Sequence, residues 1–163
     1  MDKKTIIITK KNREKKNKIN PELWCALDLS NQYIQLNNLT KLYINETYEG
    51  SKHVVKEIKK KINSYKQQDK RKKRDLTSII SFDETLEKLI VSKMVCHYCR
   101  KICKLLYNTS RDDSQWTLDR INNSEAHTKE NVVICCLKCN LKRRVTNDKK
   151  FKFTKQMVLI KRY

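Results

Sequence analysis

The stretch WTLDRINNSEAHTKENVVICCLKCN, residues 116–140, decides the fold that this sequence predicts. It opens with a short apolar run and continues through a polar segment from Asn122 to Asn131. A second apolar, β-branched run then ends at Cys135. Two such runs separated by polar residues are typical of a β-hairpin, here closed by a long loop. The residues from Leu137 to about Thr146 can continue as a basic helix, so the predicted order is strand, loop, strand, helix.

Two C-x2-C pairs, one within this stretch and one before it, predict a metal site. Four thiolates at that spacing are typical of a closed tetrahedral zinc site. The predicted ligands of a structural Zn²⁺ are Cys96, Cys99, Cys136 and Cys139. Cys103 and Cys135 complete no further pair, so we interpret both as small core residues, and Cys25 stands alone.

Charge and composition favour a polyanionic partner. The 163 residues carry 38 Lys and Arg against 18 Asp and Glu, a net charge of +20. A basic excess of this size favours nucleic acid, whose binding releases condensed counterions. The alternative is a solvated, lysine-rich surface. Only 38% of residues are hydrophobic, and a small domain with so little to bury usually needs a metal or disulfide staple.

The chain before the cysteines divides by charge runs. Residues 1–19 form a basic arm that we expect to be disordered when free. Residues 20–75 are predicted to be basic and mostly helical, with a helix starting at Asn20-Pro21-Glu22 and another at Ser51. The basic run from Gln67 to Arg74 reads as a linker or a phosphate-facing loop.

Residues 76–163 form the second predicted domain, which contains both C-x2-C pairs. Ser81 and Glu84 have the spacing of a capping box, which begins a helix leading straight into Cys96. The fold class is therefore α+β: a small ββα core with a four-cysteine zinc site, joined to a mostly helical, basic N-terminal half.

The run L-D-R-I-N-N…H…N-V-V-I-C-x-x-C-N-x-x-R resembles the HNH endonucleases, also called His-Me finger or ββα-metal nucleases. The likeness covers roughly residues 80–157 and is greatest to the zinc-knuckle variants of phages and large DNA viruses. It implies hydrolysis of DNA phosphodiester bonds with Mg²⁺ or Mn²⁺. It also implies that Asp119 and Asn140 bind this ion and that Asn131 braces the loop and orients the base. Carboxylate and amide oxygens are hard ligands that suit such cations.

One position departs from the family pattern, because the general-base histidine falls on Arg120. Arginine stays protonated and cannot abstract a proton from water. Three explanations stay open. In the first, His127 swings in and replaces the base. In the second, Arg120 binds the phosphate while bulk water or a metal-bound water supplies the nucleophile. In the third, the site is catalytically inactive. The competing interpretation of His127 is an exposed loop histidine.

Further expectations concern partners and location. Lys142, Arg143 and Arg144 follow Asn140 and are expected to face the same DNA phosphates, the alternative being a solvated helix face. No secretory signal and no membrane-length apolar run is visible, so we expect an intracellular protein, in the cytoplasm or nucleus of a host cell if it is viral. The role of the N-terminal half stays open: it could be a targeting domain, a DNA clamp or the surface of a homodimer. The alternative function is a non-catalytic, zinc-stabilised nucleic-acid-binding module.

Overall fold

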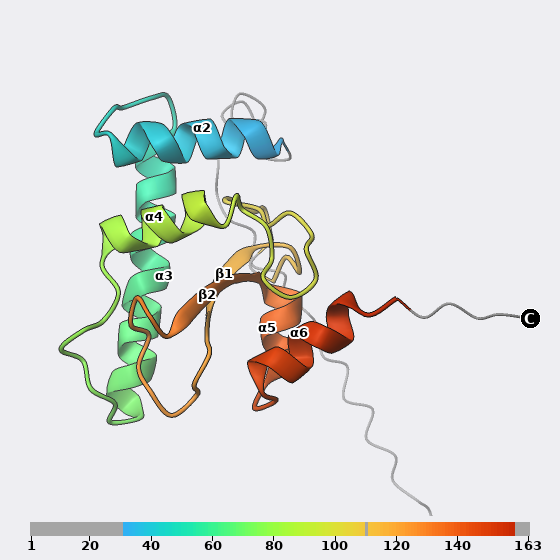
Figure 1. Cartoon of the computed structure of the whole chain (residues 1–163). Coiled ribbons are helices and arrows are strands. Elements are labelled where there is room, and N and C mark those ends of the chain that lie inside the picture. Colours follow the sequence, from blue (N-terminus) through green and yellow to red (C-terminus); the bar gives the residue numbers. More distant parts are fainter. Residues whose placement is uncertain (1–30, 110, 159–163) are drawn as a thin grey trace, which may run out of the picture.

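The computed structural model describes residues 31–109 and 111–158 (Figure 1). The predicted arm at 1–19, the helix start at 20–22 and Cys25 lie outside these residues. In chain order, the elements are α2 (Gln32–Tyr43), α3 (Ser51–Arg71), α4 (Phe82–Val91), β1 (Trp116–Arg120), β2 (Val132–Cys136), α5 (Leu137–Arg143) and α6 (Asp148–Gln156). The predicted α+β class is confirmed.

The hairpin and the helix after it form as the sequence predicted. β1 and β2 pair antiparallel, with Trp116 opposite Cys136 and Arg120 opposite Val132, and α5 follows β2 directly. α5 ends at Arg143, three residues before the predicted end at Thr146, because Arg144 takes a φ of 50°. A positive φ is costly for a residue with a Cβ and interrupts the helical hydrogen bonds.

The two central helices follow from local signals. Ser81 and Glu84 form the predicted capping box at the start of α4, each side chain bonding the other's backbone N–H. α3 begins at Ser51 as predicted and continues to Arg71. The basic run that starts at Gln67 is therefore not mainly a linker or loop, because its first five residues belong to the C-terminal end of α3.

A single hydrophobic core joins the helices to the hairpin. It includes Val54 and Ile58 of α3, Leu89 of α4, and Trp116 and Leu118 of β1. Figure 1 shows α2 and α4 crossing α3, with the hairpin beside the rest of α3. Residues on both sides of position 75 therefore contribute to one core. Among the described residues, none of the helices combines the length and apolar character that crossing a membrane requires.

Candidate functional site

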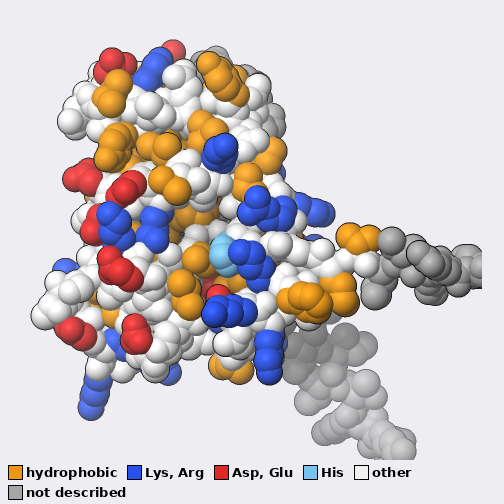
Figure 2. Space-filling view, in the orientation of Figure 1, with side chains coloured by type: hydrophobic (Ala, Val, Ile, Leu, Met, Phe, Trp, Pro, Cys, Tyr) orange, Lys and Arg blue, Asp and Glu red, His pale blue; other side chains and the backbone are white. Residues whose placement is uncertain are grey.

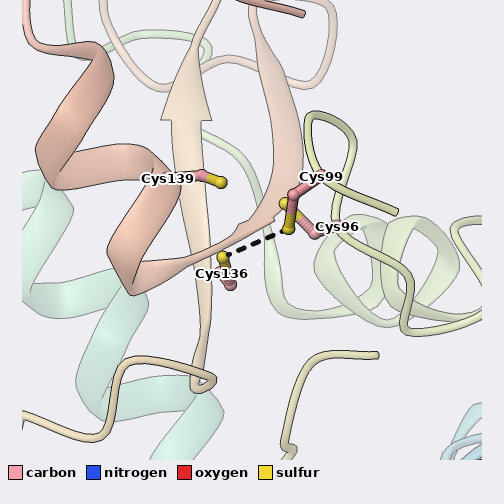
Figure 3. A group of neighbouring side chains, drawn as sticks. All are labelled: Cys96, Cys99, Cys136 and Cys139. Carbon is pink, nitrogen blue, oxygen red and sulfur yellow. Dashed lines mark hydrogen bonds between the residues drawn. The ribbon is translucent and has the colours of Figure 1, made fainter. Parts of the chain in front are cut away.

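Four cysteine side chains converge at the base of the hairpin (Figure 3). Their sulfur atoms all lie within 4.8 Å of one another, and the Sγ atoms of Cys99 and Cys136 are 3.9 Å apart. Sulfurs bound tetrahedrally about 2.3 Å from a metal would be about 3.8 Å apart, so the cluster is close enough to hold one metal ion. The complete set is Cys96, Cys99, Cys136 and Cys139. Cys103 and Cys135 are fully buried and are not part of it.

Two short segments create this cluster. After α4 the chain reverses through Lys93 and Met94, both at positive φ. The first knuckle is then closed by a hydrogen bond from the Cys96 N–H to the Lys101 carbonyl. The His97 N–H donates to the Ile134 carbonyl at 2.9 Å, which ties this knuckle to β2. The second knuckle is the junction of β2 and α5, and it therefore needs no loop of its own.

A cavity of about 440 Å³ lies between α3 on one side and β1 and α5 on the other. Four of the residues singled out in the sequence line it: Asp119, Arg120, His127 and Asn140. The remaining lining comes largely from one face of α3, including Glu57, Lys61 and Tyr65. The structure thus brings together residues from three elements and from the hairpin loop around one space.

The Asp119 carboxylate is already engaged by protein donors. Its Oδ2 accepts hydrogen bonds from the Tyr98 hydroxyl at 2.7 Å and from Arg143 Nε at 2.5 Å, and its Oδ1 accepts one from Arg143 Nη2 at 2.9 Å. A carboxylate offers about four lone-pair positions. Donors among the described residues use three of these positions, and one on Oδ1 is left for a further partner.

The Asn140 side chain is oriented by its amide nitrogen. Nδ2 donates to the Thr117 hydroxyl at 3.0 Å and to the Leu118 carbonyl at 3.3 Å. Within the described residues its Oδ1 takes part in no hydrogen bond, and this is the atom that could bind a cation. Both contacts lie on the strand that carries Asp119, so Asn140 is fixed beside the end of β1.

His127 is held firmly and is not an exposed loop residue. It is 3% exposed, and its ring stacks on Tyr65 with 4.6 Å between the ring centroids. Asp69 Oδ2 lies 2.8 Å from both the His127 backbone nitrogen and Nδ1. The His127 carbonyl accepts a hydrogen bond from the Ile80 N–H. The side chain therefore reaches the cavity in its resting position and does not need to swing in.

The contacts of His127 also determine its protonation. Burial lowers the pKa of His127, and this outweighs the hydrogen bond to Asp69 and the charge of Asp69, which raise it. Burial alone would raise the pKa of Asp69, but hydrogen bonds from His127 and Arg74 lower it. A neutral ring with its proton on Nδ1, facing an ionised Asp69, is the expected state near pH 7. Nε2 is then an acceptor.

The acceptor nitrogen of His127 is not sealed inside the core. Within the described residues, Nε2 makes no hydrogen bond. The buried side-chain atoms there that lack a partner are Gln35 Nε2 and the Tyr48 hydroxyl, and His127 Nε2 is not among them, so this atom keeps some exposed surface. His127 is one of the residues that line the cavity.

Arg120 faces the same cavity from the end of β1. Its Nη1 donates to the carbonyls of Asn123 and Glu125, each at 3.2 Å, and lies 3.7 Å from Asp69 Oδ1. Within the described residues, Nε and Nη2 make no hydrogen bond. Half of the guanidinium is thus anchored while the other half can donate to an anion in the cavity.

Asn131 closes the hairpin loop. Its Nδ2 donates to the carbonyls of Asn122 and Ala126, and its Oδ1 accepts from the Asn122 N–H at 2.8 Å. These are the backbone contacts expected of a loop-bracing residue. Asn131 does not line the cavity, but it lies in the same loop as His127.

Arg143 corrects one expectation from the sequence. It was predicted to face DNA phosphates, but it is 1% exposed, and its guanidinium binds the Asp119 carboxylate and the carbonyls of Arg120 and Thr146. Lys142 and Arg144, its sequence neighbours, are exposed. Figure 2 shows Lys and Arg side chains in the region of α5 and α6, interspersed with hydrophobic ones.

Sequence reasoning missed the contribution of α3. Glu57, Lys61, Tyr65 and Asp69 recur every fourth residue and therefore lie along one face of α3, which is turned toward the hairpin. Lys61 Nζ donates to Gln115 and to the Trp116 carbonyl, and burial lowers the pKa of Lys61 to about 8. One signal was available: Asp69 is the lone acid within the basic run from Lys66 to Arg74.

Comparison with known proteins gives no relative. No protein-family model, no curated protein and no solved structure matches this chain. The function therefore has to be argued from the residues of the cavity and the cysteine cluster.

Proposed function

We propose that this protein is a metal-dependent DNA endonuclease of the HNH type, stabilised by a zinc ion. The observation that carries the proposal is the shared cavity. Asp119, Asn140 and Arg120, which the HNH-like motif selects, line it together with an imidazole held by a carboxylate. A basic chain of net charge +20 suits a DNA substrate.

Zinc is the metal that best suits the four-cysteine cluster. Thiolates are soft ligands, and two C-x2-C pairs that bring four sulfurs together are typical of structural zinc. Four protein ligands leave no open position for a substrate, so this ion would hold the hairpin, α5 and the first knuckle together and would not take part in the chemistry.

Asp119 and Asn140 fit a hard divalent cation such as Mg²⁺ or Mn²⁺. The remaining lone-pair position on Asp119 Oδ1 and the Oδ1 of Asn140 are both oxygen donors, the type such ions prefer. When bound, such an ion would neutralise charge on the phosphodiester and stabilise the leaving 3′ oxygen. Arg143 fixes the orientation of the Asp119 carboxylate through two hydrogen bonds.

His127 is the proposed general base. With Nδ1–H donated to Asp69, Nε2 can accept a proton from the water that attacks phosphorus, while the bond from phosphorus to the 3′ oxygen breaks. The free donors of Arg120 can bind a non-bridging phosphate oxygen. The proposal combines parts of two of the three explanations for the missing histidine at position 120: His127 supplies the base, and Arg120 holds the phosphate.

Cleavage of supercoiled plasmid tests this proposal. The zinc-loaded full chain should nick the plasmid with Mg²⁺ and not with excess chelator. His127→Ala should slow cleavage by about 10²–10⁴-fold, and Asn140→Ala should raise the Mg²⁺ concentration needed. His53→Ala and Asn108→Ala, at exposed positions outside the cavity, serve as matched controls. A wild-type chain that cuts no DNA with any divalent ion would overturn the proposal.

A non-catalytic nucleic-acid-binding module is the second candidate. The observation that favours it is the Asp119–Arg143 pair, since a carboxylate with a buried cationic partner attracts a metal ion less strongly than a free one. On this alternative, DNA binding is retained, no cleavage occurs with Mg²⁺ or Mn²⁺, and His127→Ala leaves binding unchanged.

A further inference from the structure

We infer that the solvent face of α3 binds the phosphate backbone of duplex DNA and leads it to the cavity. This inference rests on the proposed function for the choice of DNA as the ligand. Exposed cations follow this face over nearly the whole helix. They are Lys52, Lys56, Lys59, Lys60, Lys66, Lys70 and Arg71. At 100° per residue they fall within an arc of about 140°.

No acidic side chain interrupts this face. The acids of α3 are Glu57 and Asp69; both lie outside this arc and are buried, 8% and 0% exposed. Within the described residues, Lys60 is the member of the set that forms an ion pair, with Glu57 at 3.3 Å. Lys59 lies over the Phe82 ring. The charges of the other members are not neutralised by a described carboxylate, so the face carries a strong positive potential.

The basic face is continuous with the candidate active site. Lys60 lines the cavity that contains Asp119 and His127, and it also lines a second, open depression beside Lys52, Lys56 and Lys59. A polyanion that follows the face toward Lys60 therefore arrives at the rim of the cavity. This continuity connects the exposed lysines to the site, and it gives the N-terminal half a role that its sequence left open.

The geometry of the face favours duplex DNA over other polyanions. Lys52 and Lys70 are about 27 Å apart along the helix axis at 1.5 Å per residue, close to one turn of duplex of about 34 Å. Asn63 and Gln67 lie between the cations, and His53 at the edge of the arc is the single ring that α3 presents there. This face of α3 therefore offers no row of aromatic rings on which successive single-stranded bases could stack. A membrane surface is disfavoured because the apolar side of α3, with Val54 and Ile58, is buried in the core.

Salt-dependent binding of the full, zinc-loaded chain tests this inference. Binding of a labelled duplex is followed by fluorescence anisotropy over a series of salt concentrations, without divalent cations other than zinc. One variant replaces Lys52, Lys56, Lys59 and Lys66 by Gln. The control variant makes the same charge change at Lys93, Lys101, Lys149 and Lys150, which are exposed outside α3. Zinc content and circular dichroism show that both variants are folded.

The α3 variant should lose about 10²-fold in duplex affinity, and the slope of log K against log salt should fall by about 3 to 4, since each neutralised phosphate contributes about 0.9. The control should change far less. Equal losses in the two variants, or tighter binding of single strands than of duplex, would overturn the inference. Because binding is measured without Mg²⁺, a protein that binds through α3 but never cleaves DNA would refute the proposed function alone. Wild-type cleavage with unchanged binding by the α3 variant would refute this inference alone.

Discussion

At the scale of single residues, the pair of Arg143 and Asp119 is the most consequential contact. Removing one partner of a buried ion pair leaves the other charged and without its counterion, which typically costs about 3–5 kcal/mol. Arg143→Met, which keeps much of the side-chain volume, should therefore lower the free energy of unfolding by about that amount. Lys142→Met, at the exposed neighbouring position, should change it by less than about 0.5 kcal/mol. Urea unfolding with zinc present measures both, and equal effects would show that Arg143 is not a structural residue.

The pair of Asp69 and His127 makes a prediction about pH. The groups that face the ring are Asp69, Arg74 and Arg120. Burial places the pKa of His127 below its ordinary 6.5. Asp69→Asn should lower it further, because the neutral amide no longer supports the protonated ring. NMR titration of the ring protons, assigned with His127→Gln, measures both values, and an unchanged or higher pKa in Asp69→Asn would contradict the contact.

The same shift has a consequence for stability. In the unfolded chain, His127 becomes protonated as the pH falls below its ordinary pKa of 6.5. In the folded chain it becomes protonated only at a lower pH, because burial lowers its pKa. The contribution of His127 to the free energy of unfolding is therefore full above pH 6.5 and declines as the pH falls below it.

Residue-level prediction from sequence worked where the chemistry is local. The four clustered cysteines form two pairs whose members are three residues apart, so the sequence alone identified the cluster. The role of Asp69 could not be predicted in this way, because its hydrogen-bond partner, His127, lies 58 positions away in the sequence. Arg143 looked like its exposed neighbours in the sequence, and its burial depends on where α5 lies against β1.

At the scale of elements, the four-cysteine cluster joins three segments: the first knuckle, the end of β2 and α5. Cys136→Ser should release the metal and unfold the hairpin, α5 and the first knuckle, since metal binding and folding form one equilibrium in small sites of this kind. Cys135→Ser changes the adjacent residue, whose sulfur lies 3.3 Å from the Thr117 hydroxyl and outside the cluster. It should keep one metal ion per chain. Metal analysis and far-UV circular dichroism distinguish the two variants, and full metal content in Cys136→Ser would exclude this ligand set.

Element boundaries followed from caps and periodicity wherever these signals were present. The capping box at Ser81 and the apolar period of α3 identified the starts of two helices. The end of α3 was misread because lysines and arginines are tolerated equally in helix and loop, and the sequence between Gln67 and Arg71 contains no glycine or proline to end the helix.

At the scale of the whole molecule, α3 serves two structures at once. Its buried face supplies core residues and cavity-lining polar groups, while its exposed face carries the lysines. Hydrogen bonds from Leu118 N–H to the Tyr65 hydroxyl and from Lys61 to the Trp116 carbonyl connect it to β1. Such tertiary contacts are invisible in the charge runs from which the boundary at position 75 was drawn.

This shared core predicts how fragments of the chain behave. A fragment of residues 76–163 would expose Leu118 and Trp116, which α3 helps to cover. It would also lack Asp69, the hydrogen-bond partner of His127. Zinc should still bind the four cysteines, but the fragment should lack cooperative unfolding and dispersed methyl signals in NMR spectra. The chain spanning residues 31–163 should show both. Adding a peptide of residues 46–75 to the zinc-loaded fragment should restore the dispersed signals, since it supplies α3. A fragment that folds cooperatively without the peptide would show that residues 76–163 are an independent domain and that α3 is only an attachment to it.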